Sequence, residues 1–70
     1  MDYANPNLYR ILAYFNGPKA RPDTFASTGC FLNAEKTAKD IAAEGYLAIV
    51  HNTESGERYE HKPTAAPVTN

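Results

Sequence analysis

The residues of this chain best suited to chemistry are a single cysteine and two histidines, Cys30, His51 and His61. A thiol beside an imidazole can act as a nucleophile, because the ring nitrogen takes up the thiol proton. No motif of a cysteine enzyme surrounds Cys30, and an unpaired cysteine usually packs as a small apolar side chain. We therefore expect Cys30 to be a passive, largely buried thiol.

The two histidines also raise the question of a metal ion. A structural zinc site needs four ligands and usually includes thiolates. His51 and His61 can approach each other diagonally across a hairpin, but only glutamates and the distant Cys30 remain to complete the ligand set. The carboxylates fall at positions that face solvent, not in an apolar pocket suited to acid–base catalysis. The sequence thus predicts no metal, no cofactor and no enzyme activity.

Cations beside aromatic residues suggest a third chemistry, the binding of single-stranded nucleic acid. Aromatic rings stack on bases while cations neutralise the backbone. Tyr14 and Tyr46 supply the rings, and the basic residues are Arg10, Lys19, Arg21, Arg58 and Lys62. However, Glu54, Glu57 and Glu60 lie among the same elements, and the formal net charge is −1. Without a global positive field, any partner must be recognised through a local patch.

Length and cysteine content set the scale of the fold. A chain of 70 residues makes one domain at most, and its core has little stability to spare. A lone cysteine excludes a disulfide within the chain, and residues 1–7 show no signal-peptide pattern. We therefore expect a cytoplasmic protein with no membrane-spanning segment.

The pattern of apolar and turn residues predicts four strands and one helix. The helix, over residues 34–44, is capped by Asn33 and ended by Gly45. Residues 16–23 form a loop with one glycine, two prolines and two cations. The expected strands cover residues 8–15, 24–31, 46–51 and 57–61.

Alternation along the strands predicts which side chains share a face. In the first strand, Tyr9, Ile11, Ala13 and Phe15 share one face, and Leu8, Arg10, Leu12 and Tyr14 share the other. In the second strand, Phe25, Ser27, Gly29 and Phe31 share a face, and Gly29 marks a bulge or a close backbone approach. The helix has an apolar stripe of Ala34, Ala38, Ile41 and Ala42.

The last two strands form a hairpin whose register decides the core. A turn at residues 53–56 that sets Thr53 opposite Glu57 also sets His51 opposite Tyr59. Leu47, Ile49, His51, Tyr59 and His61 then share a face, and Tyr46, Ala48, Val50, Arg58, Glu60 and Lys62 share the other. We expect the first set to face the core, because the second carries three charges.

The predicted fold is α+β: a single β-β-α-β-β domain over residues 1–62, with an antiparallel sheet and one helix on it, followed by a disordered tail at 63–70. One helix covers only one face of a four-stranded sheet. The other face keeps Leu8, Leu12, Tyr14, Tyr46 and Val50 near water. An uncovered apolar face on so small a protein is typical of an interaction surface.

The stretch from residue 25 to residue 60 resembles a loose class of very small phage- and prophage-encoded proteins. They share a strand, a short alanine-rich helix (here AEKTAKDIAAEG), an apolar strand (YLAIV) and an SGE turn before a last strand. Some phage anti-CRISPR proteins have this size and a similar plan. The resemblance covers about half the chain and is architectural. It implies an inhibitor that binds a bacterial protein machine, and it carries over no functional residue.

These patterns predict a small non-enzymatic module that docks its uncovered sheet face, or the loop at 16–23, onto a larger protein. A phage-encoded inhibitor of a host defence or transcription complex is its most concrete form. Tyr14, Tyr46 and Arg58 are the expected anchors, since Tyr and Arg dominate interface energetics. Lys19 and Arg21 would meet acidic groups or occupy a site meant for nucleic acid. Two alternatives remain: a nucleic-acid-binding module that uses the same face, and a self-associating homodimer.

Overall fold

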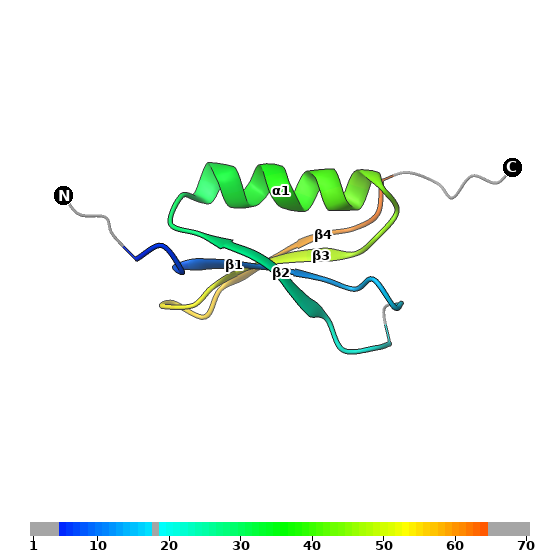
Figure 1. The fold of residues 1–70 in the computed structure, drawn as a ribbon, viewed down its shortest axis with the longest axis horizontal. Coiled ribbons are helices and arrows are strands. Elements are labelled where there is room, and N and C mark those ends of the chain that lie inside the picture. The colour runs from blue at the N-terminus through cyan, green and yellow to red at the C-terminus, as the bar shows by residue number, and fades with distance from the viewer. Residues whose placement is uncertain (1–4, 18, 65–70) are drawn as a thin grey trace, which may run out of the picture.

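A computed structural model describes residues 5–17 and 19–64 of the chain. Its elements are β1 (Tyr9–Ala13), β2 (Asp23–Thr28), α1 (Phe31–Ala43), β3 (Ala48–Asn52) and β4 (Arg58–His61). The strands form one antiparallel sheet in the order β2-β1-β3-β4. Figure 1 shows α1 lying across one face of this sheet, while the other face is left open. The predicted α+β class and β-β-α-β-β order are confirmed.

The core lies between α1 and the two central strands. Ile11 and Ala13 of β1 meet Ala48 and Val50 of β3 beneath the helix. The helix contributes its predicted stripe, and all four members are buried: Ala34, Ala38, Ile41 and Ala42. Because three of these four side chains are methyl groups, the helix backbone can approach the sheet closely. Tyr9, Ala26 and Phe31 pack around this centre.

The helix ends as predicted but starts earlier. Gly45 has a positive φ of 100°, and its N–H donates to the Ala42 carbonyl. The N–H of Tyr46 donates to the Ile41 carbonyl, which completes a glycine C-cap. The predicted start at Asn33 is wrong, because α1 begins at Phe31 with Cys30 in the N-cap position. Cys30 makes no side-chain cap bond, and its N–H donates to Thr28 Oγ1.

The register of the β3–β4 hairpin differs from the prediction by one residue. Val50 pairs with Tyr59, and His51 pairs with Arg58. The amide oxygen of Asn52 accepts hydrogen bonds from the N–H groups of Glu54 and Ser55. The Asn52 N–H donates to the Glu57 carbonyl at 2.8 Å, so that four residues, 53–56, form the turn. The predicted pairing of Thr53 with Glu57 leaves only three residues, 54–56, in the loop, and it is wrong because the Asn52 side chain closes the longer turn.

The register change reverses the predicted faces of β3. Ala48 and Val50 face α1, and their partners His61 and Tyr59 share that side. The charges of β4 do point away from the core as predicted, but they accompany Ile49 and His51. A one-residue slip has this effect because side chains alternate with a period of two.

Strand β2 is shorter than predicted and carries a bulge. The pairing passes from Ile11–Ala26 to Leu12–Thr24, which leaves Phe25 without a partner on β1. Phe31 belongs to α1 and not to this strand. Gly29 is a site of close backbone approach, because a Cβ there would lie 2.8 Å from the Asn5 carbonyl oxygen. Of the two alternatives predicted for Gly29, the close backbone approach is therefore confirmed, and the bulge of this strand lies at Phe25.

Most of the predicted tail at 63–70 falls outside the described residues. At its start, the Thr64 N–H donates to the Ala42 carbonyl at 3.0 Å. This bond places the chain after β4 beside the end of α1.

Candidate interaction surface

The open face of the sheet is built from rows of side chains that cross the strands. One row contains Arg10, His51 and Arg58, because Arg10 pairs with His51 and His51 pairs with Arg58. The next row contains Leu12, Ile49 and Glu60. These residues alternate with the core residues of each strand, so they project away from α1.

The centre of the open face is apolar. Leu12, Tyr14 and Leu47 are half-buried, and Ile49 is only 7% exposed although no helix covers this side. The Tyr14 N–H donates to the Leu47 carbonyl at 2.9 Å, which sets these two residues opposite each other beyond the last paired residues of β1 and β3. The neighbouring side chains therefore shield Ile49, and together they form a continuous apolar strip.

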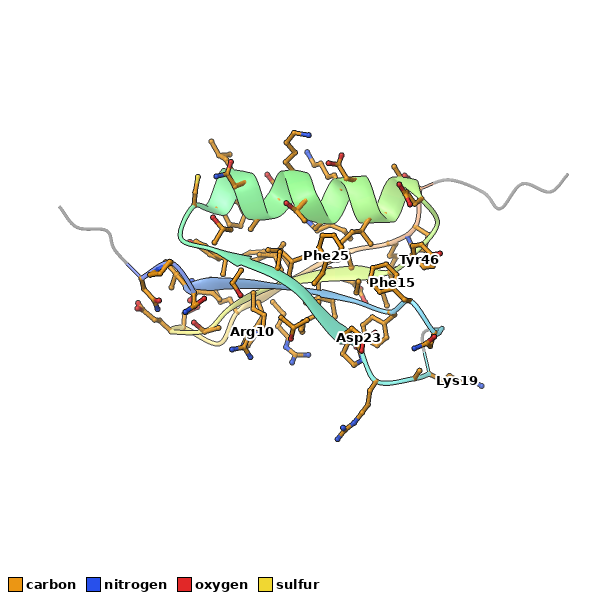
Figure 2. The ribbon with its side chains drawn as sticks, in the orientation of Figure 1. Arg10, Phe15, Lys19, Asp23, Phe25 and Tyr46 are labelled. Carbon is orange, nitrogen blue, oxygen red and sulfur yellow. The ribbon has the colours of Figure 1, made fainter. Side chains whose placement is uncertain are left out.

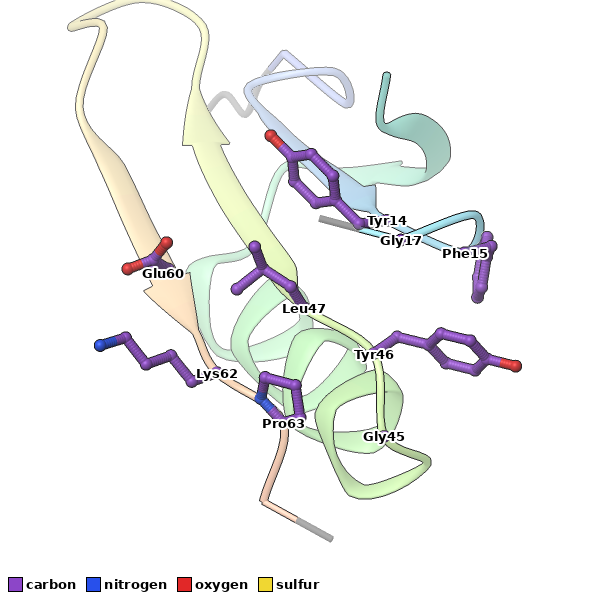
Figure 3. A pocket seen from close by; sticks show the side chains of 9 residues that line it. All are labelled: Tyr14, Phe15, Gly17, Gly45, Tyr46, Leu47, Glu60, Lys62 and Pro63. Atoms are coloured by element: carbon purple, nitrogen blue, oxygen red, sulfur yellow. The ribbon is translucent and has the colours of Figure 1, made fainter. Parts of the chain in front are cut away.

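A hollow of about 510 Å³ lies at one end of this strip. Figure 3 shows Tyr14, Leu47, Glu60 and Lys62 gathered on one side of it, while Tyr46 points the other way beside Phe15. Tyr14 and Tyr46 thus line the same hollow from different sides of the sheet. The apolar wall next to one carboxylate and one ammonium group can hold a mixed apolar and polar side chain of a partner.

The predicted site residues do not form one cluster. Tyr14 and Arg58 share the open face, whereas Tyr46 lies on the helix side of the sheet. Lys19 and Arg21 are exposed in the β1–β2 loop. Figure 2 shows this loop on the side of the sheet away from α1, the side toward which Arg10 also points. The expectation that Tyr46 and Val50 lie on the uncovered face is wrong, because the register places Val50 in the core.

His51 occupies the middle of the basic row. Its Nδ1 is buried and has no hydrogen-bond partner within the described part of the chain. A buried polar atom without a hydrogen-bond partner costs stability. In this row, two exposed arginines therefore flank a histidine whose buried Nδ1 lacks a hydrogen-bond partner among the described residues.

Sequence reasoning missed a second group of residues, which we call the aromatic cluster: Phe15, Phe25 and Tyr46. The ring centroids of Phe15 and Tyr46 are 4.9 Å apart, and those of Phe15 and Phe25 are 6.0 Å apart. Alternation correctly assigned Phe15 to the helix side, but the bulge at Phe25 left no signal in the sequence. All three rings are more than a third exposed, so they are not part of the closed core.

The remaining candidates for chemistry are dispersed. Cys30 is exposed, which contradicts the predicted burial, because it precedes α1 outside the sheet. His51 and His61 lie on opposite faces, so they do not approach each other as expected. Over residues 5–17 and 19–64, no three His, Cys, Asp or Glu side chains are grouped so that they could hold a metal ion. In the part of the chain that the structure describes, no helix has the length and apolar character needed to cross a membrane.

No protein-family model, curated protein or solved structure matches this chain.

Proposed function

We propose that this protein is a non-enzymatic binding module that docks the open face of its sheet onto an acidic surface of a larger protein. The observation that carries the proposal is the apolar strip of Leu12, Tyr14, Leu47 and Ile49 with Arg10, Arg58 and Lys62 around it. An apolar centre within a polar rim is the usual anatomy of a protein–protein interface.

The distribution of charge supports an acidic partner. Of the seven Lys and Arg residues, Lys36 and Lys39 lie on α1, which leaves five on the sheet, on the β1–β2 loop or just after β4. Among the described residues of the paired strands, one carboxylate, that of Glu60, projects from the same open face as these cations. Glu35 and Asp40 lie on α1 and Glu44 follows it, so the two sides of the molecule differ in charge. Such asymmetry orients a partner during encounter.

Nucleic acid is the second candidate, and the row of Arg10, His51 and Arg58 favours it, since cations in line can follow a phosphate backbone. The position of the aromatic rings favours a protein instead. Tyr14 is the ring on the open face, whereas Phe15, Phe25 and Tyr46 contact one another on the helix side. Binding of single strands relies on rings that stack on successive bases, and the open face offers too few.

The most specific form of the proposal rests on the architectural resemblance to small phage-encoded proteins. In this form the partner is a bacterial defence or transcription complex, and the basic face docks onto an acidic surface of that complex. Lys19 and Arg21 would then extend the basic face beyond the sheet.

The test compares two charge reversals of equal size. Arg10→Glu with Arg58→Glu changes the open face, and Lys36→Glu with Lys39→Glu changes the exposed side of α1 by the same amount. Proteins captured from a bacterial lysate by the unmodified chain should be lost with the first pair and retained with the second. Tyr14→Ala should weaken binding of the captured protein by about 1–3 kcal/mol, as truncated interface anchors do.

Three outcomes would overturn the proposal. Loss of capture with the helix pair alone would show that the wrong side had been chosen. Capture that added nuclease abolishes, with affinity that falls steeply as the salt concentration rises, would favour nucleic acid. A molecular mass twice that of the chain, abolished by the open-face pair, would mean that the face pairs with a second copy.

A further inference from the structure

The aromatic cluster borders a second hollow, which lies on the helix side of the sheet and shares Phe15 and Tyr46 with the first. Its volume is about 310 Å³, and its wall combines the three rings with Ile41. Figure 2 shows Phe15, Phe25 and Tyr46 gathered beneath the C-terminal half of α1. Phe25 is 53% exposed, Phe15 38% and Tyr46 36%, so each ring offers surface to a ligand.

The three rings contact one another without stacking face to face. Phe15 and Tyr46 meet edge to face at 75°, and Phe15 and Phe25 are tilted by 59°. An edge-to-face contact uses one face of one ring. Two contacts therefore use at most two faces of the three rings, and each of the three residues remains more than a third exposed. The negative face of an aromatic ring attracts a cation placed over it.

Two carboxylates complete the wall of this hollow. Asp40 lies on α1, and Glu44, four residues later, is the C-cap residue of that helix; both line the hollow with the rings. No Lys or Arg lines it. Lys36 Nζ is 3.3 Å from Asp40 Oδ2, but both side chains are about 70% exposed or more, so this pair contributes little and yields readily to a ligand.

We propose that this hollow binds an arginine side chain of a partner protein. A guanidinium group stacks on an aromatic face and also donates paired hydrogen bonds to a carboxylate, whereas an ammonium group does only part of this. The apolar wall formed by Ile41 and the rings takes the aliphatic stem of the same side chain. The site does not use the apolar strip or the basic row of the open face, although Phe15 and Tyr46 also border the hollow at the end of that strip.

The test is a nuclear magnetic resonance titration of the full chain with two capped tripeptides. One has the sequence Gly-Arg-Gly, and in the other citrulline replaces arginine, which keeps the shape but removes the charge. The arginine peptide should shift the ring resonances of Phe15, Phe25 and Tyr46 in a saturable way. The citrulline peptide should bind at least about two- to fivefold more weakly, which is the change in affinity expected from the loss of an exposed cation–π contact.

Matched variants show whether the hollow itself is responsible. Asp40→Asn with Glu44→Gln should weaken arginine binding by about two- to fivefold. Glu35→Gln with Glu54→Gln makes the same change in net charge away from the hollow and should leave binding unchanged. Phe25→Leu keeps an apolar side chain but removes a ring, and should weaken binding by a similar factor. Equal affinity for both peptides, equal loss with the two carboxylate pairs, or shifts confined to the open face would each overturn the proposal.

Discussion

The hydroxyl of Tyr59 donates a hydrogen bond of 2.6 Å to Glu57 Oε1, two residues earlier in the same strand region. This bond, together with the negative charge of Glu57, raises the pKa of Tyr59 above its ordinary value of about 10, because both favour the neutral phenol. The Tyr59 ring also meets Phe31 at 5.2 Å, and Phe31 meets Tyr9 at 5.4 Å. The hydrogen bond to Glu57 therefore helps to hold the Tyr59 ring against Phe31, which packs against the core at the start of α1.

The Glu57–Tyr59 bond predicts a specific dependence on pH. Because the pKa of Tyr59 is raised in the folded chain, its contribution to stability is present below the pKa of an unfolded tyrosine and is lost as the pH rises through the folded pKa. Glu57→Gln should lower the pKa of Tyr59 toward the ordinary value. Ultraviolet titration of the tyrosines measures this change, and Tyr59→Phe identifies which step belongs to Tyr59. An unchanged highest midpoint in Glu57→Gln would contradict the assignment.

At the scale of elements, the register of the β3–β4 hairpin decides what the sheet presents on each face. The turn closed by Asn52 sends Val50 into the core and Leu47 toward the hollow of the open face. A loop one residue shorter, 54–56, would instead send Leu47 into the core and Val50 to the open face. Both registers keep the charges of β4 in water, so charge alone does not choose between them.

Substitutions in β3 separate these two registers. Val50→Ala should cost about 2 kcal/mol of unfolding free energy, because it removes two buried methyl groups and leaves a cavity. Leu47→Ala removes more carbon but should cost less, since Leu47 is only half-buried. Urea unfolding measures both, with Ile41→Ala as a positive control expected to lose about 2–4 kcal/mol. A larger loss for Leu47→Ala than for Val50→Ala would support the shorter turn.

At the scale of the whole molecule, the sheet side is basic and the helix side carries aromatic rings and carboxylates. The proposals accordingly assign different chemistry to the two sides: an acidic protein surface on one and an arginine side chain on the other. Because the formal net charge is only −1, this polarity is invisible in the composition and arises from the fold.

The basic loop between β1 and β2 should act mainly on the rate of association. Lys19→Glu and Arg21→Glu place negative charges at the rim of the basic side, and rim charges steer an encounter more than they hold the complex. Both variants should slow association with a captured protein partner and reduce its salt dependence, with dissociation little changed. Stopped-flow measurements over a range of salt concentrations test this. A change in the dissociation rate alone would place the loop inside the interface.

The sequence by itself determined the order of the elements, the buried stripe of α1, its glycine end and the two faces of β1. These features depend on periodicity and on residues close together in the chain, so local physical chemistry is enough to predict them. The anchors Tyr14 and Arg58 were placed on one face for the same reason, although Arg58 was placed there through an incorrect register.

Only the tertiary structure decided the hairpin register, the bulge at Phe25, the start of α1 at Phe31 and hence the aromatic cluster. Each depends on a choice between alternatives that local preferences leave nearly equal. The Asn52 side chain selects a four-residue turn, and Cys30 takes the cap position that Asn33 could have filled. A one-residue change in the hairpin register or at the bulge moves side chains from one face of the sheet to the other, because strands alternate with a period of two.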